Sequence, residues 1–260
     1  MPPGTADRPL LEVSGLRMSY GRFAALAGVD LRVRPRTIHS VIGPNGAGKT
    51  TLFHCVTGTR HPTAGRVTFD GADVTRLASH RRTAIGMARS FQITSLFQAL
   101  TVRENVRLAV QARAAWSVAD LWRRADGREE TLAAADAVLR RIGLDGRSGA
   151  LAGELSHGQQ RILEVGLAIA ARPRMLFLDE PTSGMGVEDV PAITALVRDL
   201  AREHTILLIE HNMGIVMSIS DRVTVMHQGR VLVEGTPDEV RRDPRVRAAY
   251  LGEDVDARAP

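Results

Sequence analysis

The chain has 260 residues and a mass of 28.2 kDa, with 44% hydrophobic and 24% charged residues. These proportions are typical of a globular protein and exclude a collagen-like or disordered chain. The single cysteine, Cys55, excludes a disulfide framework and a zinc site built from cysteines. No apolar run reaches the roughly 18 residues of a membrane-spanning helix, and the first residues lack the apolar core of a signal peptide. We therefore expect a chain that neither crosses a membrane nor is exported by the usual signal.

The net charge is +5, and Lys49 is the only lysine among 34 basic residues. A nucleic-acid surface would need a clustered basic stripe with aromatic residues between the charges, but aromatic residues make up only 4%. We therefore predict no nucleic-acid partner. Pairs of arginines are expected on solvated helix faces, with contact to anionic lipid headgroups as a minor alternative. These pairs are Arg81-Arg82, Arg123-Arg124, Arg140-Arg141 and Arg241-Arg242.

The first third of the chain is rich in predicted strands. Alternating apolar residues and one continuous apolar run indicate strands, and glycines mark where elements end. The expected strands cover Leu10–Ser19, Ala27–Val33, Thr37–Ile42 and Gly65–Phe69, and a helix over Lys49–Val56 is expected to stop at Gly58.

The middle of the chain has a helical pattern rich in Ala, Leu and Arg. We expect a helical insertion from Ile93 to about Ile169, with a loop at Asp126-Gly127 between two of its helices. Thr101 with Glu104, and Ser156 with Gln159, have the spacing of a capping box, which marks a helix start.

The last third alternates between predicted strands and helices. This alternation indicates a buried, largely parallel core sheet. Gln228-Gly229 lies between two apolar runs and suggests a hairpin, and Thr236-Pro237 followed by Glu239 marks a helix start. The expected strands cover Arg174–Leu178, Thr205–Ile209, Arg222–Met226 and Arg230–Glu234, and a helix covers Val190–Arg202.

The strongest chemical motif lies between a predicted strand and a predicted helix. It matches the phosphate-loop pattern GxxxxGK[ST], and its glycines let backbone N–H groups point at phosphate oxygens. Lys49 supplies a compact charge, Thr50 a hydroxyl for Mg²⁺, and the helix N-terminus a positive dipole end. The loop consists of Gly43, Pro44, Asn45, Gly46, Ala47, Gly48, Lys49 and Thr50.

Two acids, Asp179 and Glu180, end a predicted buried strand. Ligands bind at the carboxyl ends of strands in open α/β sheets. We expect Asp179 in the Mg²⁺ shell and Glu180 polarising the attacking water. If the chain had no phosphate loop, an ordinary acidic turn after a strand would be the better interpretation. Because the phosphate loop is present, the catalytic interpretation is the better one.

Leu155-Ser156-His157-Gly158-Gln159 resembles the LSGGQ signature of ATP-binding cassette proteins. The order phosphate loop, Gln92, signature, Asp179-Glu180 and His211 is similar to that family over roughly Leu10–Gly252. The resemblance implies an α/β P-loop NTPase fold: a RecA-like core, an antiparallel β subdomain and a helical subdomain. It implies a single domain over residues 1–260, with the core and β subdomain in 10–92 and 172–252 and the signature subdomain in about 93–171.

The resemblance also implies residue roles. Glu180, His211 and Gln92 match the catalytic residues, and Thr50, Gln92 and Asp179 match those at Mg²⁺. Tyr20 matches the aromatic residue that stacks on adenine, although a packed strand tyrosine is an alternative. The ATP-binding set is Tyr20, the loop residues 43–50, Thr51, and Ser156, Gly158 and Gln159 acting on the nucleotide of the opposite subunit.

Within the family, five stretches resemble the ATPases of branched-chain amino acid importers, and two look more like urea and amide importers. The first set is residues 86–92, 100–106, 159–161, 209–213 and 234–252; the second is 155–158 and 225–229. Two positions depart from the family: His157 replaces the signature's first glycine, and Gly186 stands where an aspartate is common. The resemblance implies that these departures bear on coupling across the dimer and not on ATP binding.

The resemblance implies an ATPase subunit of an importer, with ATP and Mg²⁺, at the cytoplasmic face of the inner membrane. The implied partners are a second cassette, identical or a sister ATPase, integral-membrane permease subunits and, indirectly, a solute-binding protein. A lipid or polysaccharide exporter, or a urea or amide importer, is the alternative. A cassette ATPase of DNA repair or translation is less well supported, because this chain has one cassette and no cysteine cluster.

Overall fold

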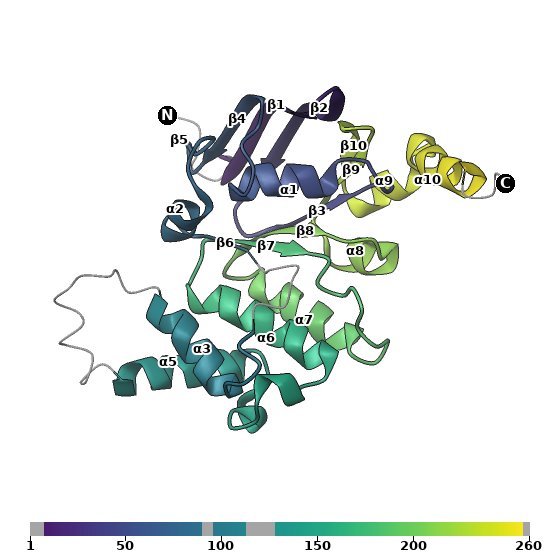
Figure 1. Ribbon diagram of the computed structural model, residues 1–260. Coiled ribbons are helices and arrows are strands. Elements are labelled where there is room, and N and C mark those ends of the chain that lie inside the picture. The colour runs from purple at the N-terminus through teal and green to yellow at the C-terminus, as the bar shows by residue number, and fades with distance from the viewer. Residues whose placement is uncertain (1–7, 90–95, 113–127, 257–260) are drawn as a thin grey trace, which may run out of the picture. The chain divides into compact units, whose positions relative to one another are not determined.

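The computed structural model describes residues 8–89, 96–112 and 128–256 (Figure 1). The chain divides into two compact units. The first contains Met1–Arg82, Phe177–Glu180 and Arg198–Pro260, and the second contains Thr83–Leu176 and Pro181–Val197. The subdomain boundaries expected from the sequence remain a prediction.

An antiparallel sheet with the order β2-β1-β4-β5 lies in the first unit. Its strands are β1 (Leu11–Tyr20), β2 (Phe23–Val33), β4 (Ala64–Phe69) and β5 (Ala72–Asp73). The strand β2 begins four residues before the expected Ala27, directly after the two-residue turn Gly21-Arg22. The two residues of β5 are too few to give a strand pattern in the sequence, and this strand was not predicted.

The second sheet has the order β10-β9-β3-β8-β7-β6. The strand β3 pairs in parallel with β8 and β9, and every residue of β3, β7 and β8 is buried, which confirms the buried parallel core expected from the apolar runs. The predicted hairpin at Gln228-Gly229 joins β9 and β10. The strands are β3 (Ile38–Ile42), β6 (Met87–Arg89), β7 (Met175–Asp179), β8 (Thr205–Ile209), β9 (Arg222–His227) and β10 (Arg230–Gly235).

Two helices of the first unit follow cap signals that the sequence shows. Helix α1 (Lys49–Thr57) contacts β2 and ends at Gly58, which adopts the left-handed conformation (φ 77°) that glycine allows. Thr236 and Glu239 form the predicted capping box, with Pro237 in the first position of α9. The other helices are α8 (Met213–Ile219), α9 (Pro237–Arg242) and α10 (Pro244–Asp256), and α2 (Ser79–Ala84) ends beyond the unit boundary.

Arg82 corrects the expectation that the arginine pairs lie on solvated faces. It is only 1% exposed, and its guanidinium donates to carbonyls of Leu77 (2.8 Å), Cys55 (3.0 Å), Thr75 (3.0 Å) and Val56. Burial lowers its pKa to about 10. Two of these carbonyls belong to the last turn of α1, where helix carbonyls lack partners within the helix, so the arginine side chain satisfies them.

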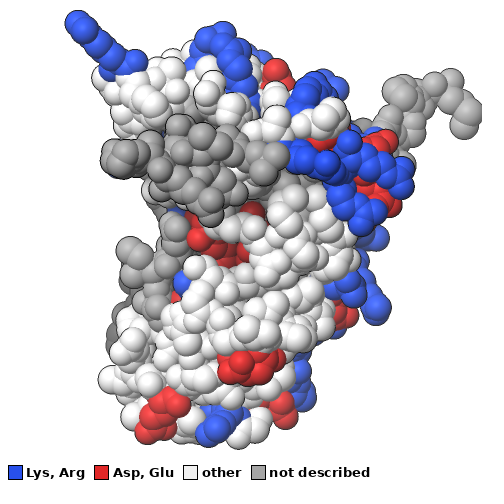
Figure 2. All heavy atoms as spheres, turned by 90° about the vertical axis from the view of Figure 1, so that its right-hand side faces the viewer, with Lys and Arg blue, Asp and Glu red and all other residues white. Residues whose placement is uncertain are grey.

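The other arginine pairs that the structure describes behave as predicted. Arg140, Arg141, Arg241 and Arg242 are exposed. Figure 2 shows basic side chains on the outer surface of one face, with acidic side chains among them. Arg123-Arg124 lies outside the described residues.

In the second unit, three helices pack against one another: α3 (Val102–Ala112), α5 (Arg128–Arg141) and α6 (His157–Ala170). The sequence predicted this helical character, although the start at Ile93 and the Asp126-Gly127 loop lie outside the described residues. The remaining elements are the short 3-10 helices η1 (Asp145–Arg147) and η2 (Ala152–Glu154), and α7 (Val190–Leu200), which crosses the unit boundary.

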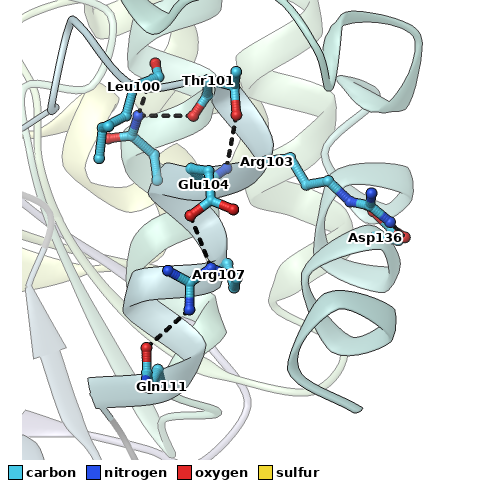
Figure 3. Close-up of polar contacts among 8 residues, drawn as sticks. Leu100, Thr101, Arg103, Glu104, Arg107, Gln111 and Asp136 are labelled. Carbon is cyan, nitrogen blue, oxygen red and sulfur yellow. Dashed lines mark hydrogen bonds and ion pairs between the residues drawn. The ribbon is translucent and has the colours of Figure 1, made fainter. Parts of the chain in front are cut away.

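Polar contacts fix α3 at its start and against α5 (Figure 3). The Thr101 hydroxyl accepts the Glu104 N–H at 3.1 Å, which is the first half of the capping box that the sequence predicts. Arg103 reaches across to Asp136 of α5 and forms a bidentate ion pair. None of the helices in the described ranges is long and apolar enough to span a membrane.

Candidate active site

The loop between β3 and α1 folds around the ammonium group of Lys49. This side chain is 6% exposed, and its Nζ donates to the carbonyls of Gly43 (2.6 Å) and Pro44 (2.9 Å). Helix α1 starts at Lys49 without a side-chain cap, since Gly48 occupies the N-cap position. A buried cation and a helix N-terminus thus lie together at this loop, a combination that suits an anion.

Two glycines of the loop are required by close backbone packing. A Cβ on Gly43 would lie 2.2 Å from the Met226 carbonyl oxygen, and one on Gly48 would lie 2.6 Å from the Ala25 carbonyl oxygen. Both also have positive φ, 150° and 98°. A Cβ on Gly46 would meet nothing within 4 Å, so that glycine serves only the backbone conformation (φ 74°).

The β9–β10 turn braces this loop, a role that the sequence analysis missed. The Gly229 N–H donates to the Ala47 carbonyl at 3.0 Å, and the Gly229 carbonyl accepts the Ala27 N–H at 2.8 Å. Phosphate loop, turn and β2 are therefore joined through one glycine. The Gln228-Gly229 dipeptide was visible as a turn, but nothing in the sequence indicates what the turn contacts.

The two predicted acids lie at the end of β7, as expected. Asp179 is 3% exposed, and Glu180 is partly exposed. Nε2 of His211, which follows β8, forms a hydrogen bond with Oε1 of Glu180. Glu210 stabilises the turn that presents His211, because its carboxylate accepts the backbone N–H groups of His211 (3.0 Å) and Asn212 (3.3 Å). Adjacent strand ends thus bring together a carboxylate and an imidazole that are far apart in sequence.

Glu180 has an unusual backbone conformation for a residue with a side chain. Its φ is 48°, in the left-handed region, which costs about 1–3 kcal/mol and persists only where surrounding contacts enforce it. Its N–H donates to the Ile209 carbonyl at 2.8 Å, and its side chain is held by His211. These two contacts fix the direction in which the carboxylate points, and strain of this kind is concentrated at functional sites.

The donors predicted for Mg²⁺ have suitable chemistry. Thr50 is exposed on the first turn of α1 and offers a hydroxyl, and Asp179 offers a carboxylate. Hydroxyl and carboxylate oxygens are hard donors of the type that Mg²⁺ prefers. Gln92, the third predicted donor, lies outside the described residues.

The signature segment starts α6 in the second unit. Ser156 is the N-cap, its hydroxyl accepts the Gln159 N–H at 3.2 Å, and the Gln159 side chain accepts the Ser156 N–H at 3.2 Å. The predicted capping box is therefore confirmed. Gln159, assigned to nucleotide binding by resemblance, is engaged in this cap. Ser156 is exposed, and Gly158 is buried.

His157 and Gly158 each lie near the loop that follows Glu180. A Cβ on Gly184 would lie 2.9 Å from Nε2 of His157, so the imidazole is next to that glycine. A Cβ on Gly158 would lie 2.1 Å from Oδ2 of Asp189, so a side chain at this position would collide with the Asp189 carboxylate. The Asp189 contact had no signal in the sequence.

Family comparisons agree with the motifs. A family model for ABC transporters matches residues 26–183, and one for branched-chain amino acid ATP-binding cassette transporters matches residues 230–256. The chain is 41% identical to the high-affinity branched-chain amino acid transport ATP-binding protein BraF of Pseudomonas aeruginosa, over 95% of this chain and 99% of that protein. It is 39% identical to LivG of Escherichia coli K12, a protein with the same description, with the same coverage.

Solved structures agree with the fold. The chain matches the ADP conformation of an ATP-binding cassette from an ABC transporter with a TM-score of 0.83 and 30% identity, over 94% of this chain and 99% of that chain. A nucleotide-free cassette matches with a TM-score of 0.82 and 30% identity, over 93% and 98%.

The fold is therefore that of an ATP-binding cassette, which confirms the predicted fold class, and the chain is an ATPase that binds ATP. It belongs to the ABC transporter family, and its C-terminal segment carries the match to the branched-chain amino acid group.

Proposed function

We propose that this chain is the ATP-hydrolysing subunit of an importer of branched-chain amino acids. The supporting observation is that the chain as a whole and its C-terminal segment match the same group of proteins. The cassette resembles BraF and LivG over nearly its whole length, and residues 230–256, which form β10, α9 and α10, match the branched-chain amino acid group by themselves. The subunit would act at the cytoplasmic face of the cell membrane, bound to permease subunits that hold the solute site.

The phosphate loop binds the triphosphate in this proposal. The Lys49 ammonium and the uncapped N–H groups at the start of α1 neutralise phosphate charge, and Tyr20 lies under the base. Thr50, Asp179 and Gln92 would hold Mg²⁺, which supplies positive charge to the transferred phosphoryl group.

Glu180 and His211 act on the attacking water. The Glu180 carboxylate accepts a hydrogen bond from the water and polarises it as the water oxygen attacks the γ-phosphorus and the bond to ADP breaks. His211, hydrogen-bonded to Glu180, orients that carboxylate and offers its ring to the γ-phosphate. Hydrolysis consumes ATP and water and releases ADP and phosphate.

Two cassettes form the working unit in this proposal. Ser156, Gly158 and Gln159 of one chain would close over the nucleotide bound at the Lys49 loop of the other. Closing and reopening of this dimer would drive the permease between two conformations. The second cassette is either another copy of this chain or a sister ATPase.

Glu180→Gln tests the chemistry. The amide keeps the size of the side chain but cannot accept a proton, so steady-state ATP turnover should fall about 10²- to 10⁴-fold while ATP binding persists. Glu188→Gln, in an exposed loop position, is the matched control and should keep normal turnover. Near wild-type turnover of the Glu180 variant would remove it from the catalytic role.

Solute uptake tests the transport assignment. The chain is co-expressed with its permease and solute-binding protein, and uptake of labelled leucine and of labelled urea is compared between wild type and Glu180→Gln. ATP-dependent leucine uptake that the variant abolishes supports the proposal. Urea uptake alone would favour the alternative importer, and co-purification with an exporter permease would favour the lipid or polysaccharide class.

A further inference from the structure

Two large aromatic side chains are exposed at the end of the β1–β2 hairpin. Tyr20, the last residue of β1, is 44% exposed, and Phe23, the first residue of β2, is 64% exposed. They are direct cross-strand partners, and such partners project from the same face of a sheet. The sequence singled out only Tyr20, by its resemblance to the family, and gave Phe23 no role.

An irregularity in the strand register determines which face this is. Met18 pairs with Leu26, but Ser19 pairs with Ala24, so β2 contains one extra residue at this point. Met18 and Tyr20 are two residues apart on β1 and therefore share a face. Phe23 consequently projects from the same face as Leu26, although they are three positions apart and regular alternation would place them on opposite faces.

That face is the one against which the phosphate loop packs. A Cβ on Gly48 would lie 3.1 Å from Cδ2 of Leu26 and 2.6 Å from the Ala25 carbonyl oxygen. The Gly229 turn ties the same region of β2 to the loop through its hydrogen bonds with Ala27 and Ala47. The two aromatic residues thus continue the face of β2 that contacts Gly48, and the contacts of β2 hold this face to the loop.

We propose that Phe23 is a second base-binding residue, which forms with Tyr20 a two-aromatic surface for the nucleobase of the bound nucleotide. The proposal rests on binding of the nucleotide's phosphates at the Lys49 loop. The base is the occupant because it is flat and apolar on its faces and is joined to the phosphates, and because Tyr20 and Phe23 lie on the face of β2 that contacts the loop through Leu26. A phenyl ring has neither hydrogen-bond donor nor acceptor, so this contact recognises the face of a purine and not its edge.

Phe23 would therefore contribute to the binding affinity of any nucleotide with a purine base, without distinguishing adenine from guanine. Stacking on an aromatic side chain is tolerant of base identity, and its loss weakens binding about tenfold or more. Phe23→Ala should therefore weaken ATP and GTP to a similar degree and leave inorganic tripolyphosphate, which lacks a base, unaffected.

The experiment measures dissociation constants of the purified full chain for ATP, GTP and tripolyphosphate by titration calorimetry. The variants are Phe23→Ala, Phe23→Leu, Tyr20→Ala and, as a matched exposed aromatic in the second unit, Phe97→Ala, which is 60% exposed in the native chain. Thermal unfolding of each variant verifies that it is folded. We expect about tenfold weaker ATP and GTP binding in Phe23→Ala, a smaller loss in Phe23→Leu, and no change in Phe97→Ala.

Three results would overturn the inference. Unchanged ATP affinity in Phe23→Ala, with a loss in Tyr20→Ala, would leave Tyr20 as the only aromatic contact. An equal loss for tripolyphosphate would show that Phe23 acts on the loop and not on the base. If the wild-type chain binds none of the three ligands, phosphate binding at the Lys49 loop fails, and the inference fails with it.

Discussion

Helices α1 and α6 both begin at a glycine- or serine-containing motif, but their first turns are completed differently. Helix α1 has Gly48 at its N-cap and no side-chain cap, and Lys49 adds a positive charge. Helix α6 has a complete capping box, in which Ser156 and Gln159 satisfy each other's backbone N–H groups. A helix start without a side-chain cap can offer its N–H groups and its dipole to a ligand. A capped start has its N–H groups satisfied by its own side chains and is stable without a ligand.

This difference indicates a division of labour between the two motifs. The α1 start has no side-chain cap and carries the Lys49 charge, so it suits primary binding of phosphate. The α6 start keeps its shape without a ligand, so it suits a preformed surface that closes onto a nucleotide already bound elsewhere. Four sets of variants test this difference and the elements on which it depends.

Removing the charge at the α1 start should have the largest effect. Lys49→Ala is expected to lower ATP turnover about 10²- to 10³-fold, the typical cost of losing one preorganised donor to the negative charge of the transition state. Lys49→Arg, the matched variant, should rescue little, because the planar guanidinium does not replace a compact ammonium held by the Gly43 and Pro44 carbonyls. Full activity of the arginine variant in a steady-state ATPase assay would show that charge alone suffices.

The strand that leads into the α1 loop should make stability depend on pH. His39 of β3 is fully buried, and its Nε2 lies 2.7 Å from the Thr224 hydroxyl. Burial lowers the pKa of His39 from 6.5 to about 4. The charge of Glu234 raises this pKa and the charge of Arg222 lowers it. In the unfolded chain, His39 is protonated below about pH 6.5. In the folded chain, the same residue is protonated only below about pH 4. Folding stability should fall by about 3 kcal/mol as pH drops through this window.

Urea unfolding at a series of pH values measures this contribution. His39→Gln should flatten the slope of unfolding free energy between pH 6.5 and 4, and His80→Gln, at an exposed position, should leave the slope as in wild type. An unchanged slope in the His39 variant would mean that the carboxylates alone cause the acid sensitivity.

Two glycines of the loop should respond unequally to the same substitution. Gly46→Ala and Gly48→Ala both place alanine at positive φ, which costs about 1–2 kcal/mol. Only the Gly48 variant also drives a Cβ against the Ala25 carbonyl. We expect Gly48→Ala to lower both the melting temperature and ATP affinity more than Gly46→Ala does; equal effects would show that the loop can move away from β2.

Removing the α6 cap should have the smallest effect. Ser156→Ala should destabilise the first turn of α6 by about 1 kcal/mol, seen as faster hydrogen exchange there, while the isolated chain keeps its ATP affinity. Thr236→Ala removes the same kind of cap from α9 and should speed exchange only in that helix. A loss of ATP affinity in the isolated Ser156 variant would contradict the division between the two helix starts.

The elements that the sequence predicted well are those with a local signal. Complete apolar runs predicted β3, β7 and β8, and cap residues predicted the starts of α6 and α9. Apart from α10, which has 13 residues, the missed helices and strands are short: β5 has two residues and β6 three, and α2 and α8 have six and seven. Such elements are too short for a periodic pattern to develop, and their pairing with distant strands defines them.

The candidate site likewise contains one part that a local sequence pattern predicts and one part that only the fold brings together. The phosphate loop could be found from its residues alone, because the loop needs its glycines and lysine at fixed spacing. The hydrogen bond between Glu180 and His211 could not, because it depends on the neighbouring positions of β7 and β8 in the sheet. His211 was assigned by family resemblance, and its partner came only from the structure.

The class of this protein could be recognised from the sequence, because the phosphate loop, the signature and Asp179-Glu180 are short motifs whose order resembles that of one family. Only the tertiary structure decided where three side chains went. Arg82, expected in solvent, is buried against the end of α1; Phe23 is turned to the face of Leu26 by an extra residue in β2; and Glu180 is held in a left-handed conformation. For Arg82 and Glu180 the deciding partners are distant in sequence, and for Phe23 the deciding feature is how β2 pairs with β1; the pattern of residues shows neither.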